Sequence, residues 1–177
     1  MKTYVALLRG INVGGHKKVS MAELRELLTN AGFQNVQTYI QSGNVIFQSS
    51  EKANVLENIM RHVIMNHFKF KLPVIIKSRD ELLSIFNACP FEKENQENSY
   101  FIIFNRIPER ELIDKVDEIA FETDEIMIIK DCLYLYCSLG YGQTKFNMHS
   151  FERKLNVVAT SRNFKTMVKL LSLSSEN

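Results

Sequence analysis

LLRGINVGGHKK, residues 7–18, leads from the end of an apolar strand into a glycine-rich, basic loop. Three glycines within six positions, Gly10, Gly14 and Gly15, allow the backbone to adopt positive φ values and to approach a partner closely. Basic residues and an amide that can donate hydrogen bonds surround them, namely Arg9, Asn12, His16, Lys17 and Lys18. The stretch therefore marks the end of the first strand and is the strongest candidate for a binding site.

The residues on either side of this loop predict a split βαβ unit. Ser20 and Glu23 match the capping box that begins a helix. Ser49 or Ser50 is the expected cap of a second helix, in which apolar residues recur at helical spacing. The expected elements are strands at 4–8, 36–40, 44–48 and 72–76 and helices at 21–31 and 55–64. Their order, β-α-β-β-α-β, is the ferredoxin-like pattern.

The second half of the chain repeats this order of elements, without convincing residue identity. The expected elements are helices at 79–86, 108–119, 145–154 and 161–171, and strands at 100–104, 125–129, 133–137 and 156–159. Thr160 is the expected cap of the last helix. The prediction is an α+β duplication: tandem ferredoxin-like units with antiparallel sheets at 1–77 and 99–160, a connecting helix and polar loop at 78–98, and a C-terminal helix and tail at 161–177.

Composition places the chain among soluble globular proteins, with 45% hydrophobic and 24% charged residues. Its apolar runs are too short to cross a membrane, and the N-terminus has no signal-peptide pattern, so we expect a cytoplasmic protein. Three cysteines without C-x-x-C spacing indicate reduced, mostly buried thiols. A nucleophilic cysteine is the less favoured alternative, because no activating residue lies beside Cys132 or Cys137.

Charge is divided unevenly along the chain. Residues 1–77 carry ten Lys and Arg against four acidic residues, residues 78–131 carry six against fourteen, and residues 132–177 carry six against two. The ends are therefore basic and the middle is acidic. This pattern predicts either an anionic partner or pairing between copies of the chain.

Connectivity should bring the first loop next to the turn of the first hairpin. In a right-handed split βαβ unit, the loop at 10–18 and the turn Gln41-Ser42-Gly43 lie at the same edge of the sheet. Helix N-termini and basic side chains favour anions there. The predicted ligand-binding residues are Arg9, Asn12, Gly14, Gly15, Lys17, Lys18, Gln41, Ser42 and Asn44. The alternative is an ordinary turn whose lysines are solvated.

A second group of candidate residues lies at the expected start of the last helix. Arg162, Asn163 and Lys165 offer a guanidinium, an amide and an ammonium group on its first turn. The alternative is a well-capped helix start with exposed basic residues. No metal site is predicted, because the four histidines show no ligand spacing, and no catalytic residue or cofactor can be assigned.

Four segments together resemble a known family. They are 7–15, Met21-Ala22-Glu23-Leu24-Arg25, Tyr39-Ile40-Gln41-Ser42-Gly43-Asn44-Val45, and Ala159-Thr160-Ser161-Arg162-Asn163 with Lys169-Leu170. In these segments the chain resembles the bacterial family catalogued as domain of unknown function 1697. The resemblance implies a two-part architecture of ferredoxin-like units and no particular activity. It also suggests that the loop, the hairpin and the Arg162-Asn163 segment form one site.

Three functions are compatible with these patterns. The favoured hypothesis is binding of a phosphorylated ligand, either a nucleotide or a nucleic-acid backbone, by the loop and hairpin. An enzyme acting on a phosphorylated small molecule is the second, with His16 or Lys17 as proton carrier, but the sequence identifies no partner for His16. The third is a homo-oligomeric assembly protein whose basic and acidic segments pair between copies.

Overall fold

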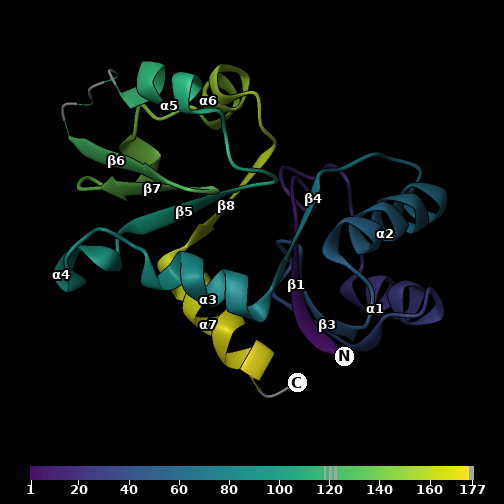
Figure 1. The fold of residues 1–177 in the computed structure, drawn as a ribbon. Helices are drawn as coiled ribbons and strands as arrows, with labels where there is room; N and C mark the ends of the chain where they lie inside the picture. Colours follow the sequence, from purple (N-terminus) through teal and green to yellow (C-terminus); the bar gives the residue numbers. More distant parts are fainter. Residues whose placement is uncertain (118, 120, 122, 176–177) are drawn as a thin grey trace. The chain divides into compact units, whose positions relative to one another are not determined.

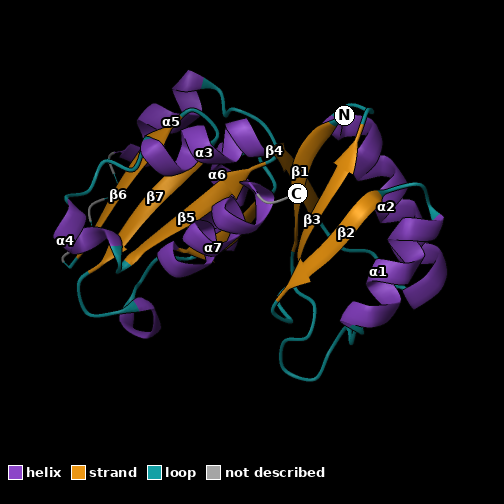
Figure 2. Cartoon of the chain, turned by 90° about the horizontal axis from the view of Figure 1, so that it is seen from below, coloured by secondary structure: helices purple, strands orange, loops and turns teal. Residues whose placement is uncertain are grey.

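The computed structural model describes residues 1–117, 119, 121 and 123–175. The chain divides into two compact units, shown in Figures 1 and 2. Unit 1 comprises Met1–Ser84 and Lys169–Asn177, and unit 2 comprises Ile85–Val168. The boundaries fall within a helix in each case, α3 (Arg79–Asn87) and α7 (Phe164–Ser175). No helix among the described residues has the length and apolar character needed to span a membrane.

Unit 1 contains the predicted β-α-β-β-α-β order. Its elements are β1 (Lys2–Leu8), α1 (Met21–Asn30), β2 (Gln34–Tyr39), β3 (Asn44–Ser49), α2 (Ala53–Phe68) and β4 (Val74–Ser78). The four strands form an antiparallel sheet of order β2-β3-β1-β4. Both helices lie on one face of this sheet (Figure 2). Because β1 is central, the loop that follows it emerges between the ends of β3 and β4.

Unit 2 repeats this topology. It contains α4 (Lys93–Gln96), β5 (Ser99–Phe104), α5 (Arg110–Asp117), β6 (Asp124–Ile129), β7 (Cys132–Cys137), a 3-10 turn (Tyr141–Gln143), α6 (Met148–Leu155) and β8 (Ala159–Asn163). Its antiparallel sheet has the order β6-β7-β5-β8, with α5 and α6 on one face (Figure 1). The predicted fold class, two ferredoxin-like units followed by a C-terminal helix, is confirmed.

Side chains alternate between the two faces of each strand, and this alternation determines which residues belong to the core of unit 1. Tyr4, Ala6 and Leu8 of β1 join the cluster beneath the helices. On α2, the stripe Leu56, Met60 and Ile64 is buried, whereas the neighbouring Val55 is 38% exposed. Burying each large apolar side chain contributes roughly 1.5–3 kcal/mol to folding, so this stripe fixes α2 against the sheet.

A corresponding core lies between the sheet of unit 2 and its helices. Ile102 and Phe104 of β5 and Leu133 and Leu135 of β7 belong to it. On the opposite face of this sheet, Phe101 stacks on Phe86 with ring centroids 5.8 Å apart. Tyr134 lies on the same face, where its hydroxyl donates a 2.7 Å hydrogen bond to the carbonyl of Ile85. Unit 2 is therefore apolar on both faces of its sheet.

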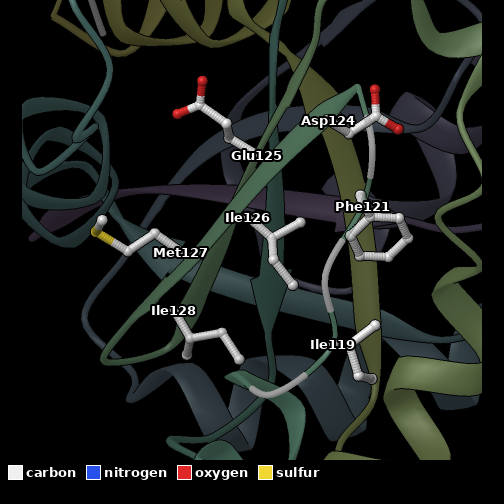
Figure 3. Close-up of a pocket in the computed structure, with 7 residues that line it drawn as sticks. All are labelled: Ile119, Phe121, Asp124, Glu125, Ile126, Met127 and Ile128. Carbon is white, nitrogen blue, oxygen red and sulfur yellow. The ribbon is translucent and has the colours of Figure 1, made fainter.

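A hollow of about 460 Å³ lies beside β6 in unit 2 (Figure 3). The lining includes Ile119 and Phe121 from the segment before β6, and residues 124–128 of the strand itself. Five of the seven lining residues are apolar, and Asp124 and Glu125 place carboxylates at one end.

The helix caps follow the sequence in one case and depart from it in another. The Ser20 hydroxyl accepts a 3.4 Å hydrogen bond from the backbone N–H of Glu23, as the capping box predicts. The prediction that Ser49 or Ser50 caps α2 was wrong. The N-cap is Lys52, without a side-chain hydrogen bond, because the Ser49 hydroxyl accepts from the N–H of Glu51 and closes a turn before the helix begins.

The sixth helix also starts later than predicted. The sequence predicted a helix from residue 145, whereas α6 begins at Met148. The Asn147 side chain caps it by accepting a 2.9 Å hydrogen bond from the N–H of Ser150. Thr144 holds the preceding backbone extended, since its hydroxyl accepts from the N–H of Phe146 and donates to the Asp124 carboxylate. A local polar turn therefore sets this boundary.

The cysteines are free thiols, as predicted. Cys132 and Cys137 are buried in β7, and Cys89 is half-buried. Burial raises the pKa of Cys137 to about 11 and also raises the pKa of Cys89 above its ordinary value. Since the thiolate is the reactive form, these surroundings disfavour a nucleophilic role.

We predict that iodoacetamide at about pH 8 modifies Cys132 and Cys137 only after unfolding. With a pKa of about 11, roughly one Cys137 in a thousand is a thiolate at this pH, and the side chain is also shielded from solvent. Mass spectrometry of native and urea-treated protein measures the modified sites. Rapid native labelling of Cys137 would contradict this assignment.

The raised pKa of Cys137 also predicts how the stability of the fold changes with pH. The folded state holds the Cys137 proton above the ordinary thiol pKa of 9.0, so the free energy of unfolding should fall as pH rises from about 9 toward about 11. Denaturant titrations of the wild type and Cys137→Ala across this range test it. The fall should be shallower in the variant.

Candidate ligand-binding site

The loop after β1 closes on itself as a miniature hairpin. Gly14 and Gly15, with φ of 58° and 78°, occupy the centre of a tight turn in which the His16 N–H donates to the Val13 carbonyl at 3.1 Å. Positive φ at both central positions is the requirement of a type I′ turn, and glycine meets it with little strain. Below the turn, the Asn12 N–H donates to the Lys17 carbonyl at 3.2 Å. The glycines therefore shape an exposed tip that carries His16 and Lys17.

Asn12 anchors this miniature hairpin to the rest of unit 1. Its side-chain oxygen accepts a 2.9 Å hydrogen bond from the Val19 N–H, and its amide nitrogen donates to the carbonyls of Val19 and Gln41 at 3.0 and 2.9 Å. The predicted proximity of the loop and the 41–43 turn is confirmed by the bond to Gln41. Because its amide is used within the chain, Asn12 positions the loop, and its predicted ligand contact stays a prediction.

The 41–43 turn is fixed to the end of β1 by a close backbone approach. The Leu8 N–H donates to the Gly43 carbonyl at 2.7 Å, and Gly43 has a φ of 83°. Asn44 is fully buried, and its amide donates to the Tyr39 carbonyl and the Ser42 hydroxyl at 3.1 and 3.0 Å. Like Asn12, Asn44 holds the backbone in place, whereas Gln41 and Ser42 are exposed.

Basic side chains connect this loop to the segment before β4. The Lys17 ammonium donates to the Lys71 carbonyl at 3.1 Å and lies 5.7 Å from the centre of the Phe70 ring. The Arg9 N–H donates to the Pro73 carbonyl at 3.1 Å, while Lys18 is exposed. The loop tip and the 70–73 segment are thus joined at one end of the unit 1 sheet.

A hollow of about 450 Å³ adjoins this segment. Its lining combines cations with apolar groups: Asn58, Arg61, His62, Met65, Lys71 and Leu72. No sequence motif marks this hollow, because its residues come from α2 and from the turn that follows α2. The available signal was the spacing of Asn58, Arg61 and Met65, which places them on one exposed face of a helix.

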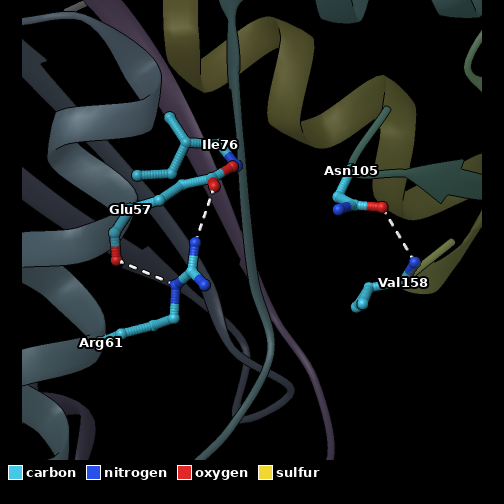
Figure 4. Close-up of polar contacts among 5 residues, drawn as sticks. All are labelled: Glu57, Arg61, Ile76, Asn105 and Val158. Carbon is cyan, nitrogen blue, oxygen red and sulfur yellow. Dashed lines mark hydrogen bonds and ion pairs between the residues drawn. The ribbon is translucent and has the colours of Figure 1, made fainter. Parts of the chain in front are cut away.

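Arg61 is oriented beside this hollow by Glu57. The Arg61 guanidinium donates to the Glu57 carboxylate at 2.9 Å and to its backbone carbonyl at 3.2 Å (Figure 4). The other carboxylate oxygen accepts a 3.0 Å hydrogen bond from the Ile76 N–H. Glu57 therefore satisfies a backbone amide of the edge strand β4 and at the same time restricts the arginine.

In unit 2, a glutamate of the second helix likewise accepts a hydrogen bond from the edge strand. Glu152 of α6 accepts a 2.7 Å hydrogen bond from the N–H of Ala159 in the edge strand β8. Its second oxygen lies 3.2 Å from Nδ1 of His149. The duplication predicted from element order thus extends to a specific glutamate that bonds the fourth strand of each unit.

The second predicted group of site residues has a different structure from the one expected. Residues 159–163 form β8, so Thr160 is not a helix cap and Arg162 is not on a helical turn. The helix starts at Phe164, and the Asn163 side chain caps it by accepting from the Thr166 N–H at 2.9 Å. Pairing of this segment with β5 overrides the helical pattern that begins at Ser161.

Arg162 is accordingly a buried residue of the unit 2 sheet. It is 8% exposed, and its guanidinium donates to the Thr160 hydroxyl at 2.9 Å and to the Ser161 carbonyl at 2.7 Å. Burial lowers its pKa to about 10. Lys165 and Asn163 are exposed on unit 2, whereas the glycine loop belongs to unit 1. The expectation that these groups form one site stays a prediction.

Metal and proton-transfer chemistry find little geometric basis in the part of the chain that the structure describes. There, no three His, Cys, Asp or Glu residues gather to hold a metal ion. Among the described ion pairs, histidine–carboxylate contacts involve His67 with Glu23 and His149 with Glu152, and none involves His16.

Comparisons with known proteins agree with this architecture. The model of the family described as "Protein of unknown function (DUF1697)" matches residues 1–134. The chain belongs to this family. The DUF1697 match covers the glycine loop, the hairpin and the basic hollow, and it extends into β7. Among curated proteins, no sequence match was found.

A solved structure shares the whole fold of this DUF1697 protein. It is titled "The structure of conserved bacterial protein SP0830 from Streptococcus pneumoniae". The two chains are 24% identical, with a TM-score of 0.76 over 98% of each chain. This similarity supports the two-unit ferredoxin-like fold and carries no information on activity.

We predict that Gly43→Ala destabilises the protein by about 2–4 kcal/mol. A Cβ at this position would lie 2.7 Å from the Leu8 Cβ and 3.1 Å from the Leu8 carbonyl oxygen, at a left-handed φ. Gly10→Ala is the matched control, because Gly10 also has a positive φ but nothing lies within 4 Å of the place that a Cβ would take there. The control should lose only about 1–2 kcal/mol in urea denaturation. Equal losses would contradict the close approach of the turn to β1.

We further predict that Glu57→Ala lowers the free energy of unfolding by about 1–3 kcal/mol, because the Ile76 N–H loses its acceptor. Glu57→Gln keeps a carbonyl oxygen at this place and should lose less than half as much. Glu26→Ala, at an exposed position on α1, controls for removal of a charge. If the alanine and glutamine variants lose the same stability, the ion pair with Arg61 is the dominant contribution instead.

Proposed function

We propose that this DUF1697 protein binds a phosphorylated ligand, a nucleotide or a nucleic-acid backbone, on a basic surface of unit 1. This basic surface consists of the loop tip and the adjoining hollow, with Arg9, His16, Lys17, Lys18, Arg61 and Lys71. The observation that carries the proposal is the bond from Lys17 to the Lys71 carbonyl, which brings the loop cations beside the hollow.

The chemistry of the hollow suits an amphipathic anion. A volume of about 450 Å³ is within the range of small-molecule sites. Met65 and Leu72 offer apolar contacts for a planar base or sugar ring, and Arg61 and Lys71 offer charge-assisted hydrogen bonds to phosphate oxygens. Glu57 restricts the Arg61 guanidinium, so less side-chain entropy is lost on binding.

The loop supplies a second set of contacts. Its glycine turn has no side chains at the two central positions, so a phosphate can approach the backbone there. Lys17 and Lys18 follow this turn directly after His16. A ligand with several phosphates can contact both the loop and the hollow, and a longer nucleic-acid strand can do so with successive phosphates.

The enzymatic alternative is less favoured. Proton transfer by His16 needs a second group that orients the imidazole, and the described ion pairs offer none. Lys17 is engaged with the Lys71 carbonyl and the Phe70 ring, which suits a positioning role within the loop.

Binding of ATP and of a fluorescein-labelled single-stranded RNA of about 12 nucleotides tests the proposal, by calorimetry and fluorescence anisotropy respectively. We expect Lys18→Ala and Lys71→Ala each to weaken binding of the preferred ligand about tenfold, because each removes a charge-assisted contact. Lys93→Ala, an exposed lysine of unit 2, is the matched control and should leave affinity unchanged.

Salt distinguishes the two ligand classes. RNA affinity should fall steeply with salt, with a slope of roughly 0.7 per phosphate contacted, while ATP affinity should fall less. Failure of both probes to bind the folded wild type would refute the proposal. So would an equal loss of affinity in the Lys93→Ala control.

A further inference from the structure

Two exposed aliphatic side chains lie beside the basic residues at the loop end of unit 1. Val13, in the miniature hairpin, is 66% exposed, and Ile40, which precedes the 41–43 turn, is 50% exposed. Val13 follows Asn12 and Ile40 precedes Gln41, and the 2.9 Å bond from the Asn12 amide to the Gln41 carbonyl joins these two segments. Both aliphatic residues therefore belong to the same end of the sheet.

Ile40 has a backbone conformation that is costly for its residue type. Its φ is 49°, and among the non-glycine residues with positive φ that the structure describes, it alone is β-branched. A branched side chain is crowded in this left-handed region, whereas asparagine and glycine enter it with less strain. Neither the strain nor the exposure of an apolar side chain helps unit 1 to fold, which points to an interaction made by the folded protein.

Cations accompany these aliphatic groups in the sequence and at the surface. Residues 13–18 are all exposed, and Lys17 and Lys18 lie within this segment, with Arg9 just before it. In Figure 2, the loop that leads into α1 extends beyond the ends of the strands of unit 1. A broad anionic partner therefore meets this loop before it reaches the sheet.

We propose that the loop tip and the 40–43 turn attach unit 1 to an anionic phospholipid surface. Val13 and Ile40 enter the boundary between headgroups and acyl chains, and Lys18 lies among the anionic headgroups. Apolar burial and attraction to a negative surface potential both strengthen such binding. This attachment goes beyond the ligand proposed above, since the described residues that line the hollow include neither of the two aliphatic residues.

The residue types favour a lipid surface over a nucleic acid or an acidic protein as the partner of the two aliphatic groups. Nucleic-acid bases stack mainly on aromatic side chains, but residues 9–18 and 40–43 contain no Phe, Tyr or Trp. Protein–protein interfaces are depleted in lysine, whereas the loop has two lysines in succession. Aliphatic groups at a basic tip match the two components of a bilayer surface, the acyl chains and the anionic headgroups.

Co-sedimentation of the full chain with lipid vesicles tests this attachment. Vesicles of phosphatidylcholine alone are compared with vesicles of phosphatidylglycerol and phosphatidylcholine in equal parts. We expect strong binding to the mixed vesicles only, and weaker binding as salt is added. Val13→Ser should weaken binding to the mixed vesicles about tenfold, because an aliphatic group leaves the interface. Lys18→Ala should weaken it about fivefold, because one cation is lost.

Ile40→Asn separates lipid binding from folding. Because asparagine tolerates a positive φ, this variant should unfold at a higher urea concentration than the wild type, yet bind the mixed vesicles at least fivefold more weakly. Val55→Ser is the matched control. Val55 is 38% exposed near the start of α2, which follows the end of β3 that lies away from the 41–43 turn, so this variant should bind vesicles as the wild type does.

ATP binding distinguishes this proposal from the preceding one. Ile40→Asn should leave ATP affinity unchanged, and a protein that binds mixed vesicles but neither ATP nor RNA would refute the phosphorylated ligand alone. Circular dichroism verifies that each variant is folded, and Ile40→Asn decides the outcome if Val13→Ser does not fold. The lipid proposal is overturned if the wild type does not bind mixed vesicles, if both aliphatic variants bind as tightly as the wild type, or if Val55→Ser loses as much binding as they do.

Discussion

Backbone amide and carbonyl groups at the margins of the two sheets must find hydrogen-bond partners, and much of the structure of each unit follows from how they do so. At the end of β1, the Leu8 N–H bonds to Gly43, which draws the hairpin turn against the central strand. At the β4 and β8 edges, the carboxylates of Glu57 and Glu152 take this role. Because an unpaired buried amide costs about 1–3 kcal/mol, these contacts add to the stability that the apolar cores provide.

The positions of the basic residues on unit 1 also depend on how backbone amide and carbonyl groups find hydrogen-bond partners. Asn12 uses both ends of its side chain to hold the loop against Val19 and Gln41, and this leaves Lys17 in reach of the Lys71 carbonyl. Glu57 bonds the edge of β4 and thereby holds Arg61 beside the hollow. Hydrogen bonds within unit 1, made by Asn12 and Glu57, thus hold Lys17 and Arg61 in place.

The two units of the duplication differ in what surrounds their equivalent residues. Both units use a helix glutamate against their fourth strand, but the surroundings differ: the unit 1 glutamate holds an arginine, and the unit 2 glutamate lies beside His149. Unit 1 has the glycine loop and the basic hollow, whereas unit 2 has an acidic and apolar edge at β6. The similarity to SP0830 over 98% of both chains indicates a shared two-unit fold, within which such differences can serve separate functions.

Local pattern by itself was enough to predict the order of the strands and of the longer helices, the Ser20 cap and the free cysteines. It missed the short helix α4 (Lys93–Gln96), which lies in the stretch predicted to be a polar loop. Periodicity and capping act over a few residues, so they can be read along the chain. Connectivity then predicted that the loop would meet the 41–43 turn, and the bond from Asn12 to Gln41 confirms it. The start of the last helix was misjudged, because pairing of β8 with β5 depends on residues about sixty positions apart and outweighs local helical preference. Tertiary structure alone decided that Asn12 and Asn44 hold the backbone in place and that Arg162 is buried. It also decided that Glu57 reaches the Ile76 amide. Each of these features depends on a hydrogen-bond partner or a packing environment that only the folded chain supplies.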